Sequence, residues 1–186
     1  VPVAVVLTGQ HTDLLDGTLA PDLADGATAL ALPSDGNVTR WETKASAKLS
    51  DLLTERKPTA VLVQGDTMSV AAAAEAAVAA DMPLVHVEAG VRSGNPSEPW
   101  PEEQIRRHVS TLAEVHYCAT QTALANLERE YARGIKVVTG NPVVTALHDA
   151  GARQLPSAGH VVITLHRREL RLRKDAFDVL TRLMSA

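Results

Sequence analysis

Several ionisable and amide side chains of this 186-residue sequence stand where a short apolar run ends. Asp66, Glu88 and His166 each close or follow such a run, and Asn141 follows another. Glu102 lies at the start of a segment with helical apolar spacing. A carboxyl or imidazole group that is held in place can accept or donate a proton during a reaction. The candidate chemistry is therefore acid–base catalysis.

Each carboxylate also has a structural interpretation. Asp66 and Thr67 are good N-cap residues for the helix expected after them. Glu102 and Glu103 match the positive end of a helix dipole. Glu88 is harder to explain in this way, because it ends a strongly apolar strand, where burial of an unpaired carboxylate is costly or raises its pKa. A functional role is favoured for Glu88.

The histidines and the cysteine divide differently. His166 is equally compatible with a hydrogen-bonded structural histidine and with a proton carrier. His86 lies within an apolar strand, which favours a structural role. Cys118 is the only cysteine, so neither an intrachain disulfide nor a cysteine zinc cluster can form. Its apolar surroundings in the sequence favour a small buried side chain over a nucleophile.

Apolar runs alternate with helical patterns along the chain, which is typical of βαβ units and a parallel sheet. Strands are expected at residues 3–7, 28–32, 60–64, 83–87, 115–119, 136–139 and 161–165. Helices are expected at residues 38–56, 67–80, 101–112, 121–131, 143–152 and 171–183. This order predicts an α/β, Rossmann-like parallel sheet with helices on both faces. Ligands bind outside the carboxyl ends of such strands, where the polar residues gather.

Composition excludes several other classes of protein. The formal net charge of −4 and the lack of basic clusters argue against a nucleic-acid partner. The basic run at residues 167–174 is interrupted, so a solvated face is favoured over a phosphate site. No stretch is apolar and long enough to cross a membrane. The signatures of redox dinucleotide enzymes, P-loop ATPases and serine hydrolases are missing.

Six short motifs occur in the order found in one enzyme family. They are Thr8-Gly9-Gln10-His11, Val63-Gln64-Gly65-Asp66-Thr67, His86-Val87-Glu88-Ala89-Gly90-Val91-Arg92-Ser93-Gly94, Pro99-Trp100-Pro101-Glu102-Glu103, Thr139-Gly140-Asn141 and His166-Arg167-Arg168-Glu169. With them the chain resembles the bacterial non-hydrolysing UDP-N-acetylglucosamine 2-epimerases. The resemblance implies half of a two-domain, glycosyltransferase-B-type architecture.

The resemblance also implies a domain organisation. Residues 1–153 would form the Rossmann-like sugar-side domain, without the family's first strand and helix. Residues 154–186 would be a linker and the start of a truncated nucleotide-binding domain. The boundary falls in the segment 152–159, which carries Pro156 and Gly159. A chain of this extent is expected to be a fragment and to be poorly active by itself.

The activity implied is interconversion of UDP-N-acetylglucosamine and UDP-N-acetylmannosamine at C2, by anti elimination and re-addition of UDP without cofactor or metal. The implied catalytic residues are Asp66, Glu88, Glu102 and His166. The implied substrate-binding residues are Arg92, Arg107, Asn141 and Arg167. Gln10 and His11 match a stretch associated with a regulatory nucleotide-sugar site. The resemblance further implies a homodimer whose substrate is also its allosteric ligand. The single cysteine and the lack of a signal peptide or spanning segment favour a cytoplasmic protein.

Departures from the family leave alternatives open. A Gly-Thr-Arg-Pro-Glu loop that supplies an arginine to the family's site has no counterpart here. Thr12-Asp13 follows His11 where a basic residue is usual, and Leu170 replaces a common Asn. A hydrolysing epimerase that releases free N-acetylmannosamine is one alternative. A catalytically silent nucleotide-sugar-binding or assembly module is another.

Overall fold

The computed structural model describes residues 2–10, 26–32, 37–151, 178 and 181–182. The expected strand at 161–165 and the boundary at 152–159 lie outside the described residues, as do His11, His166 and Arg167. Of the expected helix at 171–183, only residues 178, 181 and 182 are described, and these are helical. In the described part of the chain, no helix is both long and apolar enough to cross a bilayer.

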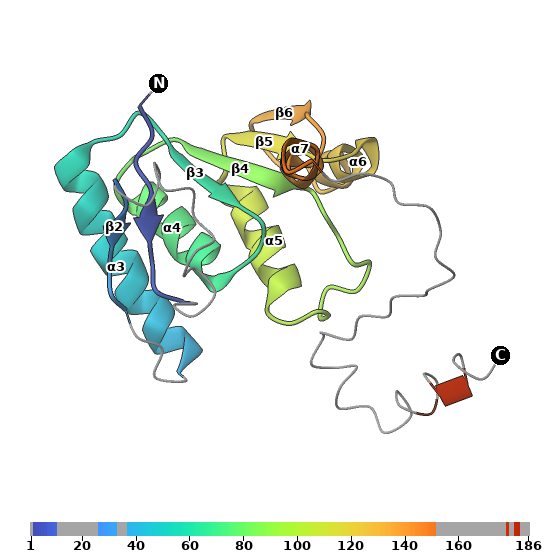
Figure 1. Cartoon of the computed structure of the whole chain (residues 1–186), viewed down its shortest axis with the longest axis horizontal. Coiled ribbons are helices and arrows are strands. Elements are labelled where there is room, and N and C mark those ends of the chain that lie inside the picture. The colour runs from blue at the N-terminus through green and yellow to red at the C-terminus, as the bar shows by residue number, and fades with distance from the viewer. Residues whose placement is uncertain (1, 11–25, 33–36, 152–177, 179–180, 183–186) are drawn as a thin grey trace.

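The described strands form two parallel sheets (Figure 1). Strand β1 (Val6–Leu7) pairs with β2 (Thr28–Ala29). The larger sheet has the order β3-β4-β5-β6 and consists of β3 (Val61–Gln64), β4 (Leu84–Ala89), β5 (Val115–Cys118) and β6 (Ile135–Val138). All pairs are parallel, which confirms the α/β prediction. In the described part of the chain the strands fall into two parallel sheets, because β1 and β3 do not pair.

Between residues 37 and 151, five helices connect or follow these strands. They are α3 (Val38–Arg56), α4 (Met68–Ala79), α5 (Glu102–Leu112), α6 (Gln121–Arg129) and α7 (Pro142–Asp149). Most begin at a side-chain cap: Thr67 accepts from the Val70 amide, and Thr120 from the Ala123 amide. Such caps satisfy amides that have no partner within the helix. A polar residue before the apolar stripe therefore sets where four of these five helices start, and α5 begins at Pro101 without a side-chain cap.

The alanine-rich helix α4 lies between the larger sheet and α3. Ala72 and Ala76 face α3, where they join a cluster with the buried Trp41. Ala71 and Ala74 belong to a second cluster, which includes side chains of β3, β4 and α5. Small side chains let two layers approach the helix closely on opposite sides. This packing fixes the start of α4 against the ends of β3 and β4.

Gly90 brings the end of β4 against α6. A Cβ atom at this position would lie 2.2 Å from the carbonyl oxygen of Ala123, so only glycine fits. Ala89, Cys118 and Leu127 form the buried cluster around this contact. The loop that leads from β4 to α5 therefore begins from a fixed point.

Candidate active site

Glu88 is held in an unusual backbone conformation at the end of β4. Its φ is +65°, in the left-handed region that non-glycine residues seldom occupy. The register between β4 and β5 shifts between Val87 and Ala89, so Glu88 is the extra residue of a β-bulge. Left-handed backbone costs a residue with a Cβ about 1–3 kcal/mol, and such strain clusters at functional sites. Because of the bulge, the Glu88 side chain does not follow the alternation of side-chain directions along β4.

The Glu88 carboxylate lies beside Gly65, the first residue after β3. A Cβ atom at Gly65 would stand 3.7 Å from Glu88 Oε2. Gly65 is fixed from two sides, because its amide donates to the Val87 carbonyl over 3.1 Å and its carbonyl is 2.8 Å from His86 Nε2. The carboxyl ends of β3 and β4 thus form one rigid edge that carries Glu88 and, next along the chain, Asp66.

Asp66 forms an ion pair with Arg106 of α5, and both side chains are largely buried. Thr67, not Asp66, is the N-cap of α4. The capping interpretation is therefore confirmed for Thr67 and wrong for Asp66, whose carboxylate is directed toward α5. Arg106 also contacts Glu103 over 3.4 Å, so a single guanidinium joins α5 to the loop after β3.

The two glutamates at the start of α5 have different environments. Glu103 is fully buried and accepts hydrogen bonds from the Ser93 amide and from Arg107 Nε, both over 3.1 Å. It therefore anchors the loop after β4. Glu102 Oε2 is buried, and among the described residues no donor reaches it. A buried acceptor without a partner is costly and can accept a hydrogen bond from a ligand.

Two arginines predicted to bind substrate are engaged within the protein. Arg92, whose side chain is only 6% exposed, holds Glu130 at 2.6 Å through Nη2 and at 3.0 Å through Nε. Arg107 bridges Glu103 and Glu130, at 2.8 Å from the latter. Hydrogen bonding from Arg92 lowers the pKa of the Glu130 carboxyl. These arginines fasten α5 and the loop after β4 to the end of α6.

Asn141 and Gln10 also make internal contacts. Asn141 is the N-cap of α7 and accepts from the Val143 amide over 3.0 Å. Gln10 Oε1 accepts from the amide and the hydroxyl of Ser69, over 2.9 and 2.7 Å. Gln10 therefore ties the end of β1 to the first turn of α4. Its predicted regulatory partner, His11, lies outside the described residues.

Two histidines and the cysteine are enclosed. His86 and His116 are 1% and 0% exposed, and each has Nε2 bonded to a backbone carbonyl. Burial lowers the pKa of both imidazoles. Cys118 is fully buried, and burial raises the pKa of its thiol. His86 and Cys118 fit the structural interpretation, and a reactive thiolate is disfavoured.

The structure places Asp66 against Arg106 of α5 and the Glu88 carboxylate beside Gly65, and Glu102 lies one helical turn before Arg106. Trp100, just before that helix, is 60% exposed at the end of the loop. The residue missed by sequence reasoning is Arg106. The sequence could have indicated this residue, because Arg106 follows Glu102 by four residues and Glu103 by three. Residues at these spacings are neighbours on a helix.

The sequence model of the UDP-N-acetylglucosamine 2-epimerases matches residues 1–186. The chain belongs to this family. It is 38% identical over 146 residues to the UDP-N-acetylglucosamine 2-epimerase of Neisseria meningitidis, a match that covers 77% of the chain and 39% of the relative. The Escherichia coli enzyme is 37% identical over the same lengths. The epimerase-family chain thus spans less than half of these relatives.

Solved structures of epimerases are similar in fold. The Neisseria meningitidis enzyme bound to UDP-GlcNAc has a TM-score of 0.62 and 36% identity, covering 65% of this chain and 33% of that one. The Methanocaldococcus jannaschii UDP-GlcNAc 2-epimerase, in complex with UDP-GlcNAc and UDP, has a TM-score of 0.61 and 30% identity, covering 68% and 36%. The epimerase-family chain therefore shares the α/β fold of the matched part of these proteins.

Proposed function

We propose that the complete gene product interconverts UDP-N-acetylglucosamine and UDP-N-acetylmannosamine by inversion at C2. The observation that carries the proposal is Glu88, strained into the left-handed region on a bulge beside Gly65 and Asp66. Strain of this kind persists where the position of a side chain matters more than stability. Family membership, and relatives solved with UDP-GlcNAc and UDP, support the choice of substrate.

The chemistry asks for two proton-handling groups and a means to stabilise departing diphosphate. In the first half-reaction a carboxylate removes the C2 proton while the C1–O bond to UDP breaks, which leaves a glycal. In the second half-reaction UDP re-adds at C1 and an acid delivers a proton to the opposite face of C2. Asp66, Glu88 and Glu102 are the carboxyl groups proposed for these transfers, and neighbouring carboxyl groups share their protons. His166 is proposed to assist at the diphosphate or in proton transfer.

Arg106 is proposed as a positioning residue in this scheme. Its guanidinium holds Asp66 and is itself held by the fully buried Glu103. Arginine is suited to this, because its planar fork fixes direction as well as charge. The carboxylate of Asp66 is thereby prevented from turning toward solvent before a substrate arrives.

The decisive test is solvent exchange. The complete gene product is incubated with UDP-N-acetylglucosamine in deuterium oxide, and both epimers are examined by NMR. Deuterium at C2 of both supports the proposal, because the C2 proton must leave during elimination. Release of free N-acetylmannosamine would select the hydrolysing alternative. Thermal stabilisation by the nucleotide sugar without exchange or turnover would select a silent binding module.

The remaining proposals concern the assembly and its ligands. We propose a cytoplasmic homodimer that binds no nucleic acid and whose nucleotide-sugar substrate also acts at a regulatory site near Gln10. In support of this last point, Gln10 accepts a hydrogen bond from the amide of Ser69, in the first turn of α4 and two residues after the N-cap Thr67. Equilibrium sedimentation tests the dimer. Binding stoichiometry of the nucleotide sugar, with a Gln10→Ala variant as comparison, tests the second site.

A further inference from the structure

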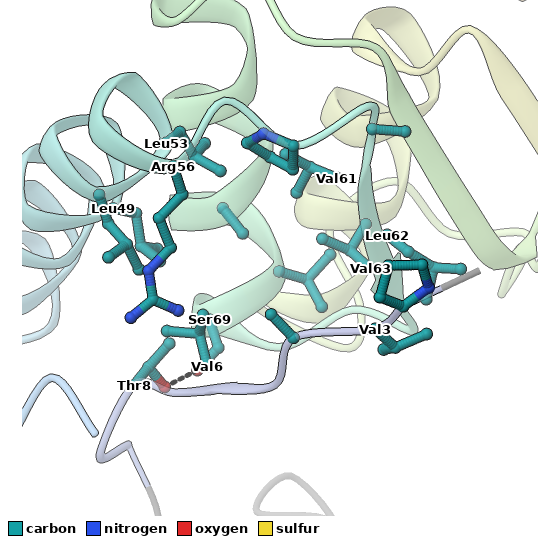
Figure 2. A pocket seen from close by; sticks show the side chains of 17 residues that line it. Val3, Val6, Thr8, Leu49, Leu53, Arg56, Val61, Leu62, Val63 and Ser69 are labelled. Atoms are coloured by element: carbon teal, nitrogen blue, oxygen red, sulfur yellow. Dashed lines mark hydrogen bonds between the residues drawn. The ribbon is translucent and has the colours of Figure 1, made fainter. Parts of the chain in front are cut away.

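Two features of the structure take no part in the proposed proton transfers. One is an apolar groove of about 680 Å³ between β1 and β3, which is lined by side chains such as Val6, Leu53 and Leu62 (Figure 2). The other is an ion-pair cluster at the end of α6, here called the Glu130 cluster, which consists of Arg92, Glu103, Arg107 and Glu130. Of the two, the Glu130 cluster contacts the loop that leads to Glu102.

This loop, residues 90–101, leaves the end of β4 and returns at the start of α5, directly before Glu102 (Figure 1). Glu102 is one of the carboxyl groups proposed to move protons, so the path of the loop decides where this group lies. Residues 93–98 and Trp100 are exposed. Few apolar contacts are available to hold this stretch, which leaves the task to polar groups.

Polar contacts close the base of the loop. The Ser93 amide donates to Glu103 Oε2 over 3.1 Å, which joins the beginning of the loop to the first turn of α5. Arg92, the preceding residue, donates from Nη2 to Ser110 Oγ over 3.0 Å, further along the same helix. Glu103 is fully buried and the Arg92 side chain is nearly so, and hydrogen bonds of charged groups are strong where water is excluded. The base is therefore a fixed joint.

Glu130 binds both arginines at this joint. Its Oε2 accepts from Arg92 Nη2 over 2.6 Å, and its Oε1 accepts from Arg107 Nη1 over 2.8 Å. Arg107 in turn donates from Nε to Glu103 Oε1 over 3.1 Å. A carboxylate whose two oxygens bind different guanidinium groups has little freedom to turn. Glu130 thus fixes Arg92 and Arg107 relative to each other.

Helix α6 supports Glu130 through contacts outside the cluster. The side-chain amide of Asn126 donates to the Gly90 carbonyl over 3.0 Å. Gly90 itself packs so closely on the Ala123 carbonyl that no Cβ atom fits, and Leu127 is fully buried beside it. The position of Glu130 relative to the end of β4 is therefore set independently of the loop.

The ion pairs continue from the cluster to the carboxyl end of β3. Glu103 also contacts Arg106, and Arg106 holds Asp66. Along this path carboxylates and guanidinium groups alternate, in the order Asp66, Arg106, Glu103, Arg107, Glu130 and Arg92. Every charge on the path has a neighbour of opposite sign, so removal of one group leaves its neighbours without a partner.

We propose that Glu130 is a positioning residue for Glu102. By binding Arg92 and Arg107 it fixes the base of the loop and, with it, the first turn of α5. Glu130 acts through these two arginines and not on the substrate. The catalytic part of this inference rests on the proposed function, because Glu102 has its role there. The fixing of the loop does not depend on that function.

Amide hydrogen exchange tests the fixing of the loop without any activity. The complete gene product is compared with its Glu130→Gln variant. The Ser93 amide is expected to exchange at least about 10-fold faster in the variant, relative to the Gly65 amide, since a hydrogen-bonded amide exchanges only through opening. The Gly65 amide is bonded to the Val87 carbonyl and reports any general loss of stability. An unchanged ratio of Ser93 to Gly65 exchange overturns the proposal.

Steady-state kinetics test the catalytic part. Glu130→Gln is expected to lower kcat about 10–100-fold with KM within about twofold, because misplacement of a catalytic group slows the chemical step. Glu130→Asp keeps the charge on a shorter side chain and should recover part of kcat. Glu128→Gln, the same substitution at an exposed position of α6, is the control and should behave as wild type. Wild-type kcat in Glu130→Gln, or a rise in KM alone, overturns the proposal.

The remaining outcomes are also decisive. If Glu130→Gln does not fold, Glu130→Asp takes its place, and a Ser93 ratio and kcat equal to wild type then overturn the proposal. If the unsubstituted protein incorporates no deuterium at C2, the proposed function fails, and the role of Glu102 fails with it. The exchange ratio of Ser93 to Gly65 would still decide whether Glu130 fixes the loop.

Discussion

The carboxyl end of β3 and its open edge border two regions that are held together in different ways. At its carboxyl end, Asp66 and its neighbours are held by side chains from other elements: Arg106 reaches Asp66 from α5, and His86 reaches the Gly65 carbonyl from β4. Along its open edge, β3 offers bare backbone and the exposed Leu62 to an apolar groove. Contacts within the described chain hold the first region together. In the second region, no strand of the described chain pairs with the open edge of β3.

The difference teaches where each kind of signal can be read. A polar edge is made by side chains, so residue types and spacings reveal it. An open strand edge is made by unpaired backbone groups, and backbone groups are the same for every residue. Apolar side chains at such an edge look like those of any buried strand. Substitutions in the two regions should therefore behave differently.

The largest expected effect is on catalysis by Glu88. Glu88→Gln in the complete gene product should reduce turnover about 10²–10⁴-fold, because an amide cannot carry the proton. The free energy of unfolding should change little, since the side chain keeps its size. Deuterium incorporation at C2 and urea unfolding measure the two effects. Full turnover by Glu88→Gln would remove this carboxylate from the proposed mechanism.

Glu88→Gly separates strain from chemistry at the same position. Glycine adopts positive φ without the Cβ penalty, so the variant should be about 1 kcal/mol more stable while it loses the same activity. A loss of stability would show that contacts of the Glu88 side chain outweigh the strain of its backbone.

The next effect concerns the ion pairs behind the edge. Glu130→Gln should destabilise the 186-residue chain by about 3 kcal/mol, because it leaves the buried Arg92 guanidinium without its carboxylate. The double variant Arg92→Leu, Glu130→Leu should recover most of this loss, since no unpaired charge remains. Urea unfolding of the three proteins forms the comparison. Equal stability of Glu130→Gln and wild type would mean that these contacts are dispensable.

Substitution of Arg106 tests whether this residue positions Asp66 at the carboxyl end of β3. Arg106→Gln should lower kcat of the complete gene product about 10–100-fold with little change in KM, since small misplacement of a catalytic group is costly. Arg106→Lys should restore part of kcat, because the charge beside Asp66 returns without the fork. Gln104→Ala, on an exposed position of the same helix, is the control. A change in KM alone would assign Arg106 to substrate binding.

Much of this arrangement was predictable from sequence, and the exceptions have physical reasons. Apolar periodicity located the helices to within one or two residues at most ends, because burial sets that pattern. The motif residues Asp66 and Glu88 were placed at strand ends correctly. The different environments of Glu102 and Glu103 were not predictable, since both are acidic residues in one helical turn. The ion pairs of Arg92 and Arg107 were not predictable either, because sequence does not show that Glu130, from another helix, lies against them.

Acidification should weaken the fold through its buried histidines. Burial lowers the pKa of His86 and His116 in the folded chain, whereas in the unfolded chain both titrate near about 6.5. Below that pH the unfolded state takes up protons that the folded state resists, so stability is present above about pH 6.5 and is lost as pH falls toward the folded pKa. Each unit of lowering corresponds to about 1.4 kcal/mol.

The measurement is urea unfolding between pH 7.5 and 5. His116→Gln should reduce the slope of stability against pH in this range, because Gln can donate to the same Arg133 carbonyl and does not titrate. His148→Gln, at an exposed position of α7, should leave the slope unchanged. An identical slope in His116→Gln would show that this imidazole does not contribute.

The smallest expected effect is at the groove. Leu62→Lys in the 186-residue chain should change the free energy of unfolding by less than about 0.5 kcal/mol, because the side chain is 65% exposed and a lysine there stays in water. Leu84→Ala, at a buried position of the neighbouring strand, should cost about 2–5 kcal/mol in the same assay. If Leu62→Lys clearly lowers the free energy of unfolding of the 186-residue chain, the comparison between the two regions fails, because the edge of β3 would then be covered. Self-association would be measured next by sedimentation.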